Sequence, residues 1–280
     1  MVFIDKTTEH SHNSKQRLEN WTISFRSHGE NLEQLYAREG QTGTALWKRI
    51  SRTVKKRLRE DLSIEQDRIC CYCGKRLTTL LRIEHFLSKS NKAEFITRVF
   101  NYDNLLLSCE GEYSDTIRYA NGHLETLEEF AIRKNVTIDD LEELNPNKNL
   151  NSIGINDKIR FAKDHCDPHK GNNEEDIIDP TKYQKCWEYF SFDYDGGIVF
   201  NDKIDNETIK TLVGNSIRVL NLDNEKLKEE RRNALNFFTD ELQILIENSQ
   251  DFDINNYFST KLNTKYPFCF VMYHFIQSYG

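Results

Sequence analysis

Long hydrophobic runs are missing from this 280-residue chain, and no apolar stretch approaches the roughly 20 residues that a membrane-spanning helix needs. A secretion signal is missing as well, because polar residues follow the short apolar start at residues 2–4. We therefore expect a cytoplasmic protein with no membrane partner.

Positive charge is scarce over the chain as a whole, which has a net charge of -7. Attraction to phosphate is the main source of affinity for nucleic acids. An enzyme of this composition that acts on nucleic acid would therefore rely on a partner for much of its affinity for the substrate. A Walker motif is also missing, so any ATPase activity would have to come from a partner.

The scarce positive charge is concentrated in residues 47–59, which hold seven basic residues and no acidic one. Apolar side chains recur there at every fourth position, at Leu46, Ile50, Val54 and Leu58. This spacing predicts an amphipathic helix with a basic outer face. The face could be an ordinary solvated surface or a surface that contacts phosphate.

Cysteine is present in seven copies, and four of them have positions suited to metal binding: Cys70 and Cys73 in a Cys-x-x-Cys pair, Cys109 and Cys166. Without a secretion signal, this usage favours a metal site over disulfides. A closed set of four thiolates is typical of structural zinc, so we predict structural Zn²⁺ here. His165 could compete as a ligand, and we expect Cys71, Cys186 and Cys269 to be buried packing residues.

Glu84 and His85 stand side by side between the first cysteine pair and Cys109. A one-metal phosphodiesterase needs a cation at the scissile phosphate and a base that activates water. Histidine suits the role of base because its ordinary pKa lies near working pH. Taken alone, however, a histidine is more often a packed or surface residue.

The order of these groups along the chain is more specific than any one of them. Cys-x-x-Cys, Glu-His, Asn104, Cys109 and the run Cys-Asp-x-x-Lys-Gly from Cys166 resemble the HNH endonuclease family with its ββα-metal core. The resemblance implies His85 as general base, with Asn104 holding the loop that carries it.

The same resemblance implies a catalytic Mg²⁺ or Mn²⁺. Glu84 and Asp167 would bind this cation, where Asp167 replaces the asparagine or histidine usual in the family. His169 could share in metal binding, and Lys170 could contact phosphate.

Longer runs look like one HNH branch in particular, the HNH subunit of Septu anti-phage systems, which is also the effector of certain retrons. They cover residues 63–66, 84–90, 101–109, 178–180 and 217–223. The resemblance implies an ABC-type ATPase partner, and a reverse transcriptase with its non-coding RNA if a retron is involved. DNA is the expected nucleic-acid substrate, and RNA is the alternative.

The second cysteine pair is unusual, because residues 110–165 separate Cys109 from Cys166, whereas two residues are usual in the family. Within this gap, residues 119–161 predict a strand, helices over 126–132 and 138–144, and a closing strand over 157–161. The unit resembles a LysM module. If its two ends meet, four thiols can still bind one ion.

Together these patterns predict an α+β protein in which an HNH ββα-metal core with structural zinc is flanked by helices and interrupted by a βααβ LysM-like module. The predicted units are an N-terminal helical segment (1–62), the first part of the core (63–118), the LysM-like insertion (119–161), the second part of the core (162–180), and a C-terminal region (181–280). The last contains a predicted hairpin over 187–200, helices over 208–219 and 224–248, and an aromatic-rich stretch, 267–276, that we expect to pack in the core.

Two alternatives to an active nuclease remain open at this point. The chain could be a catalytically silent, zinc-scaffolded subunit that binds nucleic acid. It could also be a sensor in which the LysM-like insertion detects cell-wall fragments and the nuclease is the output.

Overall fold

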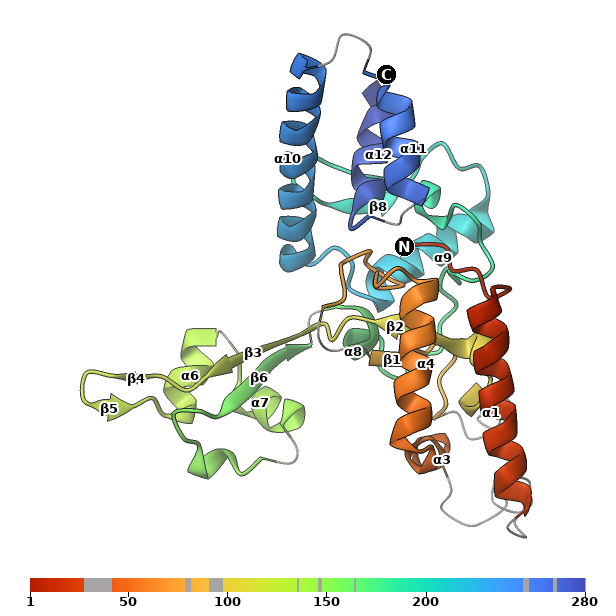
Figure 1. Cartoon of the computed structure of the whole chain (residues 1–280). Helices are drawn as coiled ribbons and strands as arrows, with labels where there is room; N and C mark the ends of the chain where they lie inside the picture. Colours follow the sequence, from red (N-terminus) through yellow and green to blue (C-terminus); the bar gives the residue numbers. More distant parts are fainter. Residues whose placement is uncertain are drawn as a thin grey trace.

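The computed structural model describes residues 1–27, 42–78, 82–90, 98–134, 136–145, 148–163, 165–248, 252–263 and 266–279. They form helices and small two-stranded sheets, so the predicted α+β class is confirmed. A central body contains α4 (Arg52–Glu65) and the pair β1 (Arg82–His85) and β2 (Leu105–Ser108), and a slender unit projects from its side (Figure 1). No helix in these ranges is both long and apolar enough to cross a bilayer.

The N-terminal helices are α1 (Glu9–Ser27), α3 (Gly43–Arg49) and α4, and α1 packs against α4. One continuous helix over residues 47–59 is a wrong prediction, because the chain breaks between α3 and α4. Ser51 causes the break: its hydroxyl accepts a hydrogen bond from the Val54 N–H at 3.2 Å and caps α4. Five of the seven basic residues are nevertheless exposed, and Lys55 and Arg59 are half-buried.

The core around the two cysteine loops is a short hairpin-like sheet covered by α4. Strand β1 pairs with β2 in antiparallel register, with Glu84 opposite Leu106 and His85 opposite Leu105. Every residue of β2 is buried, as expected for a strand covered on both faces. The side-chain amide of Gln66, just after α4, bonds to both backbone groups of Leu107 and thereby fixes the helix to β2.

The insertion between Cys109 and Cys166 is a separate small unit. Its strands β3 (Glu112–Thr116) and β6 (Lys158–Lys163) pair in antiparallel fashion and carry α6 (Leu127–Lys134) and α7 (Ile138–Leu144). It has its own core, formed by Ile117, Phe130, Ala131, Leu141, Leu150 and Ile159. A strand, two helices and a closing strand are thus present in the predicted order.

The boundaries of the insertion differ from the prediction of 119–161. The first strand of the pair is Glu112–Thr116, within the segment that we assigned to the first part of the core. Tyr119 belongs instead to the tiny hairpin of β4 (Tyr119–Ala120) and β5 (His123–Leu124), whose turn residues Asn121 and Gly122 both have positive φ. The unit therefore spans about 112–163.

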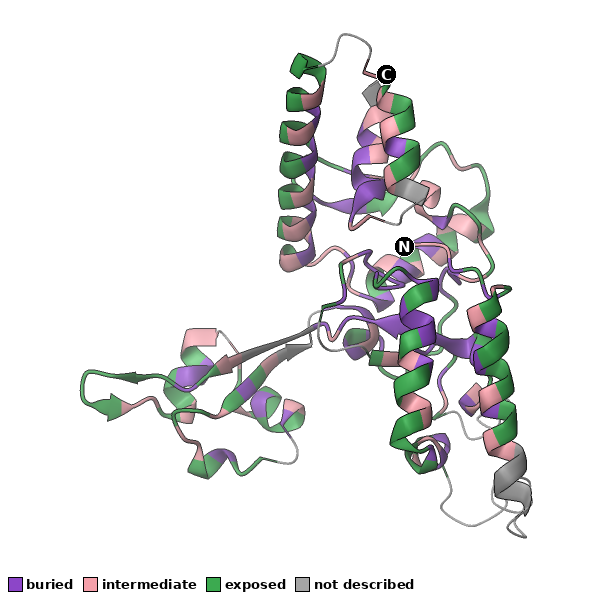
Figure 2. Ribbon diagram, viewed as in Figure 1, coloured by how far each residue is buried: buried purple, intermediate pink, exposed green. Residues whose placement is uncertain are grey.

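The C-terminal hairpin and helices lie where the sequence predicts them. They are β7 (Phe190–Phe192), β8 (Ile198–Phe200), α9 (Glu207–Val219) and α10 (Glu225–Asn248), followed by α11 (Ile254–Asn263) and α12 (Cys269–Tyr279). The buried stripe of α10 faces α12, and its other side is exposed (Figure 2).

The aromatic tail packs in the core, as predicted. Phe268, Phe270 and Phe275 are buried, and the ring of Phe270 lies against Gly74 in the Cys-x-x-Cys loop. Gly74 has φ of +76°, and a Cβ there would collide with this ring. The C-terminal helix and the cysteine loop therefore share one core.

Candidate functional site

Four buried thiols converge at the junction of the two core segments. The sulfur atoms of Cys70, Cys73, Cys109 and Cys166 all lie within 4.8 Å of one another. Two of the distances, from Cys70 to Cys166 and from Cys73 to Cys109, are 3.8 Å. Four sulfurs arranged tetrahedrally around zinc at about 2.3 Å lie about 3.8 Å apart. The set can therefore bind a metal ion such as zinc.

The insertion brings its two flanking cysteines together because its stem is closed. Just beyond β3 and β6, the His165 N–H donates to the Gly111 carbonyl at 3.3 Å. Gly111 has φ of +58°, and a Cβ there would collide with the His165 carbonyl oxygen. The predicted meeting of the two ends is confirmed.

The other candidates for this metal site stay outside it. His165 is buried next to Cys166 but does not belong to the converging group. Cys71, Cys186 and Cys269 are buried packing residues, as predicted. Within the group, burial raises the pKa of the Cys166 thiol, whereas hydrogen bonds from Cys109 and Cys166 overcome burial at Cys73 and lower the pKa of that thiol to about 7. A thiol with this pKa is readily converted to the thiolate that a metal needs.

A polar pocket of about 280 Å³ lies beside the thiol cluster. Its lining joins the end of β1 to α8 (Cys166–Lys170) and consists of Arg82, Ile83, Glu84, His85, Ser88, Lys89, Asp167, Pro168, Gly171 and Asn172. Three of the residues predicted for catalysis, Glu84, His85 and Asp167, thus share one pocket.

His85 is held in a defined tautomer. It is 2% exposed, and its Nε2 lies 3.1 Å from the Val99 carbonyl oxygen. Because a carbonyl only accepts, Nε2 carries the proton and Nδ1 carries the lone pair. Nδ1 is buried and has no hydrogen-bond partner among the described residues. The edge-on ring of Trp47, at 4.5 Å between centroids, completes the packing.

Burial also keeps His85 neutral. It lowers the pKa of the imidazole to about 3, and the positive charge of Lys89 acts in the same direction. The imidazole is therefore neutral and keeps a lone pair on its buried Nδ1, while a pKa of about 3 makes it a weak base in the empty pocket.

Asn104 braces the loop that follows His85. Its side-chain Nδ2 donates to the carbonyls of Leu87, at 2.9 Å, and Arg98, at 3.1 Å, while Oδ1 accepts from the Leu87 N–H at 2.7 Å. Arg98 directly precedes Val99, whose carbonyl orients His85. Asn104 therefore positions the histidine and does not line the pocket itself.

Glu84 and Asp167 form a close carboxylate pair. Burial and the negative charge of Asp167 raise the pKa of Glu84 to about 8. Asp167 is bound by Arg82 at 2.5 Å, and Glu84 accepts from the Tyr72 hydroxyl at 3.0 Å. Each of the two carboxylates already has a basic partner, Lys170 for Glu84 and Arg82 for Asp167, and their oxygen atoms are donors of the kind that Mg²⁺ or Mn²⁺ takes.

Lys170 and His169 do not have the positions that the sequence suggested. The Lys170 side chain is 3% exposed and bonds to Glu84 at 2.7 Å, so it neutralises this carboxylate and does not line the pocket where phosphate would bind. The reason is that a buried carboxylate requires a counter-charge. His169 is exposed, and its Nδ1 lies 3.0 Å from the Val219 carbonyl, so it fixes α8 to α9 and stays away from the carboxylates.

Sequence reasoning missed Arg82 and Lys89 in the pocket lining, as well as Trp47 beside His85. Arg82 stands two positions before Glu84, and residues alternate in direction along a strand, so their shared face could have been found from β1. No comparable local pattern links Trp47 to His85, because the two are far apart in the chain.

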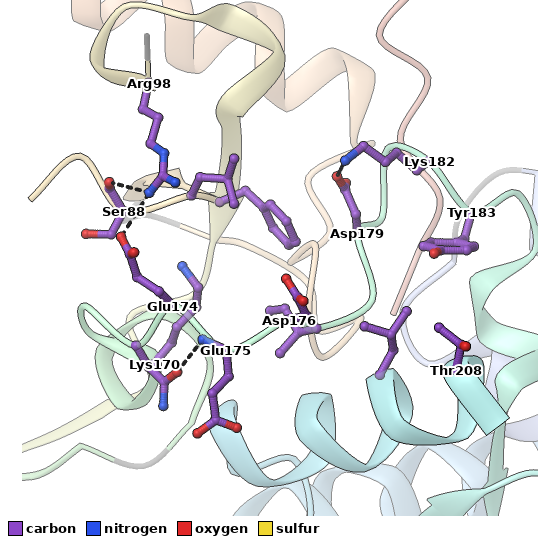
Figure 3. A pocket seen from close by; sticks show the side chains of 15 residues that line it. Ser88, Arg98, Lys170, Glu174, Glu175, Asp176, Asp179, Lys182, Tyr183 and Thr208 are labelled. Carbon is purple, nitrogen blue, oxygen red and sulfur yellow. Dashed lines mark hydrogen bonds and ion pairs between the residues drawn. The ribbon is translucent and has the colours of Figure 1, made fainter. Parts of the chain in front are cut away.

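A second cavity, of about 380 Å³, lies between the loop after His85 and the chain after α8 (Figure 3). Four of its charged side chains pair with one another: Arg98 bonds to Glu174 at 2.9 Å, and Lys182 to Asp179 at 3.2 Å. The Arg98–Glu174 pair joins the two segments that line this cavity, and the lining lacks the histidine of the first pocket.

No protein-family model matches the sequence, and no curated protein matches it either. Functional conclusions therefore depend on the arrangement of the residues.

Proposed function

We propose that the protein is a metal-dependent HNH endonuclease that hydrolyses phosphodiester bonds with His85 as general base. The observation that carries this proposal is the state of His85. It is neutral, its tautomer is set by Val99, its Nδ1 is unused, and it lines a pocket with two carboxylates. This combination of base and hard-cation ligands is what phosphodiester hydrolysis requires.

In this mechanism a water molecule gives a proton to Nδ1 of His85 and attacks the phosphorus atom, and the bond between phosphorus and the 3′ oxygen breaks. In the imidazolium that forms, Nε2–H still donates its hydrogen bond to the Val99 carbonyl, so the ring does not need to turn. The negative phosphodiester raises the basicity of His85 relative to the empty pocket. Glu84 and Asp167 would bind the Mg²⁺ or Mn²⁺, which when bound neutralises charge on the phosphate and on the leaving 3′ oxygen.

The four thiols would bind structural Zn²⁺ and fix the catalytic groups. Asp167 directly follows Cys166, and Tyr72, which bonds to Glu84, lies between Cys70 and Cys73. A metal that binds these cysteines would therefore also fix the positions of Glu84 and Asp167 relative to each other.

We further propose that the chain works in the cytoplasm as the nuclease effector of a Septu-type anti-phage complex with an ABC-type ATPase. If the system is a retron, a reverse transcriptase and its non-coding RNA would join the complex. The acidic net charge and the missing Walker motif support the need for such a partner. DNA is the proposed substrate, with RNA as the alternative outcome of the test.

The test compares wild-type protein with His85→Ala, in the presence of the ATPase partner, on plasmid DNA and on RNA with Mg²⁺ or Mn²⁺. We expect cleavage to fall by about 10²-fold or more in His85→Ala, the usual contribution of a general base. The matched control is His12→Ala, which changes an exposed histidine of α1. Undiminished cleavage by His85→Ala, with zinc content unchanged, would refute the proposal.

One observation favours a catalytically silent nucleic-acid binder as the second candidate. Glu84 already accepts bonds from Lys170 and Tyr72, so one carboxylate oxygen is satisfied without a metal. In that case wild-type protein would bind nucleic acid but would not cut it under any metal condition, and His85→Ala would behave like wild type.

A further inference from the structure

We propose that the basic face of α3 and α4 binds the phosphate backbone of the nucleic-acid substrate and leads the strand to the His85 pocket. The basic face consists of Lys48, Arg49, Arg52, Lys55, Lys56, Arg57 and Arg59. The inference rests on the proposed nuclease function for the identity of the pocket, and it adds the surface that holds the substrate.

The charge distribution singles out this face. Residues 48–59 contain seven basic residues and no acid, in a chain whose net charge is -7. In salt of physiological strength, charges more than about 8 Å away are largely screened. A phosphate in contact with the basic face therefore experiences its local positive charge more strongly than the acidic surfaces elsewhere.

The helices present this charge to solvent. Lys48, Arg52, Lys56 and Arg57 are exposed, whereas the apolar side of the helices is buried in the core. The stripe from Arg52 to Arg59 is about 10 Å long at 1.5 Å per residue, which matches about three nucleotides at 3.4 Å per nucleotide. Several basic side chains can thus contact successive phosphates of one strand.

A chain of contacts connects the basic face to the catalytic pocket. Gly43, the first residue of α3, approaches the Lys89 carbonyl so closely that a Cβ would collide with it, and Lys89 lines the pocket. One turn further along, the Trp47 ring packs edge-on against His85. The amine of Lys55 lies 5.5 Å from the centre of that Trp47 ring.

The connection between the basic face and the His85 pocket favours nucleic acid as the ligand over an anionic membrane surface, which also attracts basic helices. A helix that lies on a membrane inserts an apolar face. Here Leu46, Ile50 and Leu58 are buried in the protein, so that face is not available. Figure 1 shows α3 at one end of α4, and α4 itself beside the core that contains β1 and β2. A backbone bound along α4 therefore continues toward the pocket where the proposed chemistry occurs.

The experiment removes four exposed charges by the combined substitutions Lys48→Gln, Arg52→Gln, Lys56→Gln and Arg57→Gln. Both this variant and the parent also carry His85→Ala, so that binding is measured without cleavage. The probe is a short fluorescent DNA duplex, with an RNA of the same sequence alongside, and the readout is fluorescence anisotropy over a salt titration. The matched control removes four exposed charges from the C-terminal part of the chain, by Lys182→Gln, Lys185→Gln, Lys203→Gln and Arg232→Gln.

We expect the basic-face variant to bind about tenfold more weakly or worse, and its log–log salt slope to shrink by about 1 for each lost phosphate contact. The control variant should bind like its parent. Unchanged thermal unfolding and zinc content would show that the variant is folded. Equal affinity loss in both variants, or no loss in the basic-face variant, would overturn the inference.

The two proposals fail in different ways. If the parent binds nucleic acid through the basic face but the protein with His85 intact never cuts, the nuclease proposal fails and this inference stands. If the basic-face variant loses only its affinity for the ATPase partner and binds DNA and RNA normally, the surface serves a protein partner and the inference is wrong.

Discussion

At the scale of single residues, Asn104 fixes the backbone next to His85. Its amide bonds to the backbone on both sides of the loop between Leu87 and Arg98, next to the carbonyl that orients the imidazole. Asn104 is 6% exposed, so no solvent replaces these bonds when they are removed. Asn104 therefore links the conformation of this loop to the tautomer of His85.

We therefore predict that Asn104→Ala destabilises the protein by about 1–3 kcal/mol, because buried backbone groups lose their partners. Cleavage should fall by a factor on the order of 10², since the base is misplaced. Urea denaturation and plasmid nicking measure the two effects, with the exposed Asn151→Ala as control. Wild-type stability and activity in Asn104→Ala would show that the loop is held by other means.

Lys170 is the second residue whose role depends on burial. It shares a buried ion pair with Glu84, and removing one partner leaves the other charge uncompensated. Lys170→Met should therefore destabilise the protein by about 3–5 kcal/mol. Adding Glu84→Gln should recover most of this loss in denaturant unfolding, while cleavage stays absent. If the double variant is as unstable as Lys170→Met alone, the ion pair is not the cause.

At the scale of elements, the insertion shows how a module can interrupt a metal site without opening it. The antiparallel pair of β3 and β6 returns the chain to its starting point, and the unit has its own hydrophobic core. Ion pairs also join its first strand to its first helix, because Arg133 and Lys134 each bond to Asp115 at 2.6 Å. Arg133 also bonds at 2.5 Å to Glu125, which lies just before that helix.

These pairs make the insertion sensitive to acid. Hydrogen bonds from Lys134 and Arg133 hold the pKa of Asp115 well below its ordinary value, and a bond from Arg133 lowers the pKa of Glu125. Asp115 and Glu125 therefore take up protons more readily in the unfolded chain than in the folded one. The stability that the two ionised carboxylates contribute is complete above pH 4.5, the ordinary pKa of glutamate, and is lost as the pH falls below it.

We predict that residues 111–165, expressed alone, melt at a clearly lower temperature at about pH 3 than at neutral pH. Circular dichroism measures the transition, and Arg133→Met should reduce the difference because it removes the partner of both carboxylates. Equal melting temperatures of the wild-type unit at both pH values would contradict this account.

The sequence predicted those elements whose signal is local. The Cys-x-x-Cys pair, the Glu-His pair and the periodic helices are each readable within a few residues. The stem strand Glu112–Thr116 was missed because its polar composition gives no apolar alternation, and the break at Ser51 was missed because a cap competes with periodicity. The role of Lys170 could not be predicted, since burial of a long charged side chain depends on tertiary packing.

At the scale of the whole molecule, the thiol cluster joins parts that are distant in the sequence. Its ligands come from the loop after α4, the end of β2 and the start of α8, on either side of the insertion. Through Gly74 the same loop supports the C-terminal helix α12. A metal ion would bind the four thiols only when the folded chain brings them together, so its binding free energy would add to the stability of the folded state.

We predict that Cys109→Ser loses the bound metal and much of the folded core, because three thiols no longer close the tetrahedral site. Cys71→Ser is the matched control: Cys71 is equally buried and adjacent to Cys70, but it lies outside the converging group. Atomic emission should find about one zinc per chain in wild-type protein and Cys71→Ser, and little in Cys109→Ser. A strong chelator should lower the melting temperature of wild-type protein toward that of Cys109→Ser. If Cys109→Ser instead keeps its metal and melts with the wild type, the four thiols are packing residues and the carboxylate pocket must be fixed by β1, β2 and Lys170 alone.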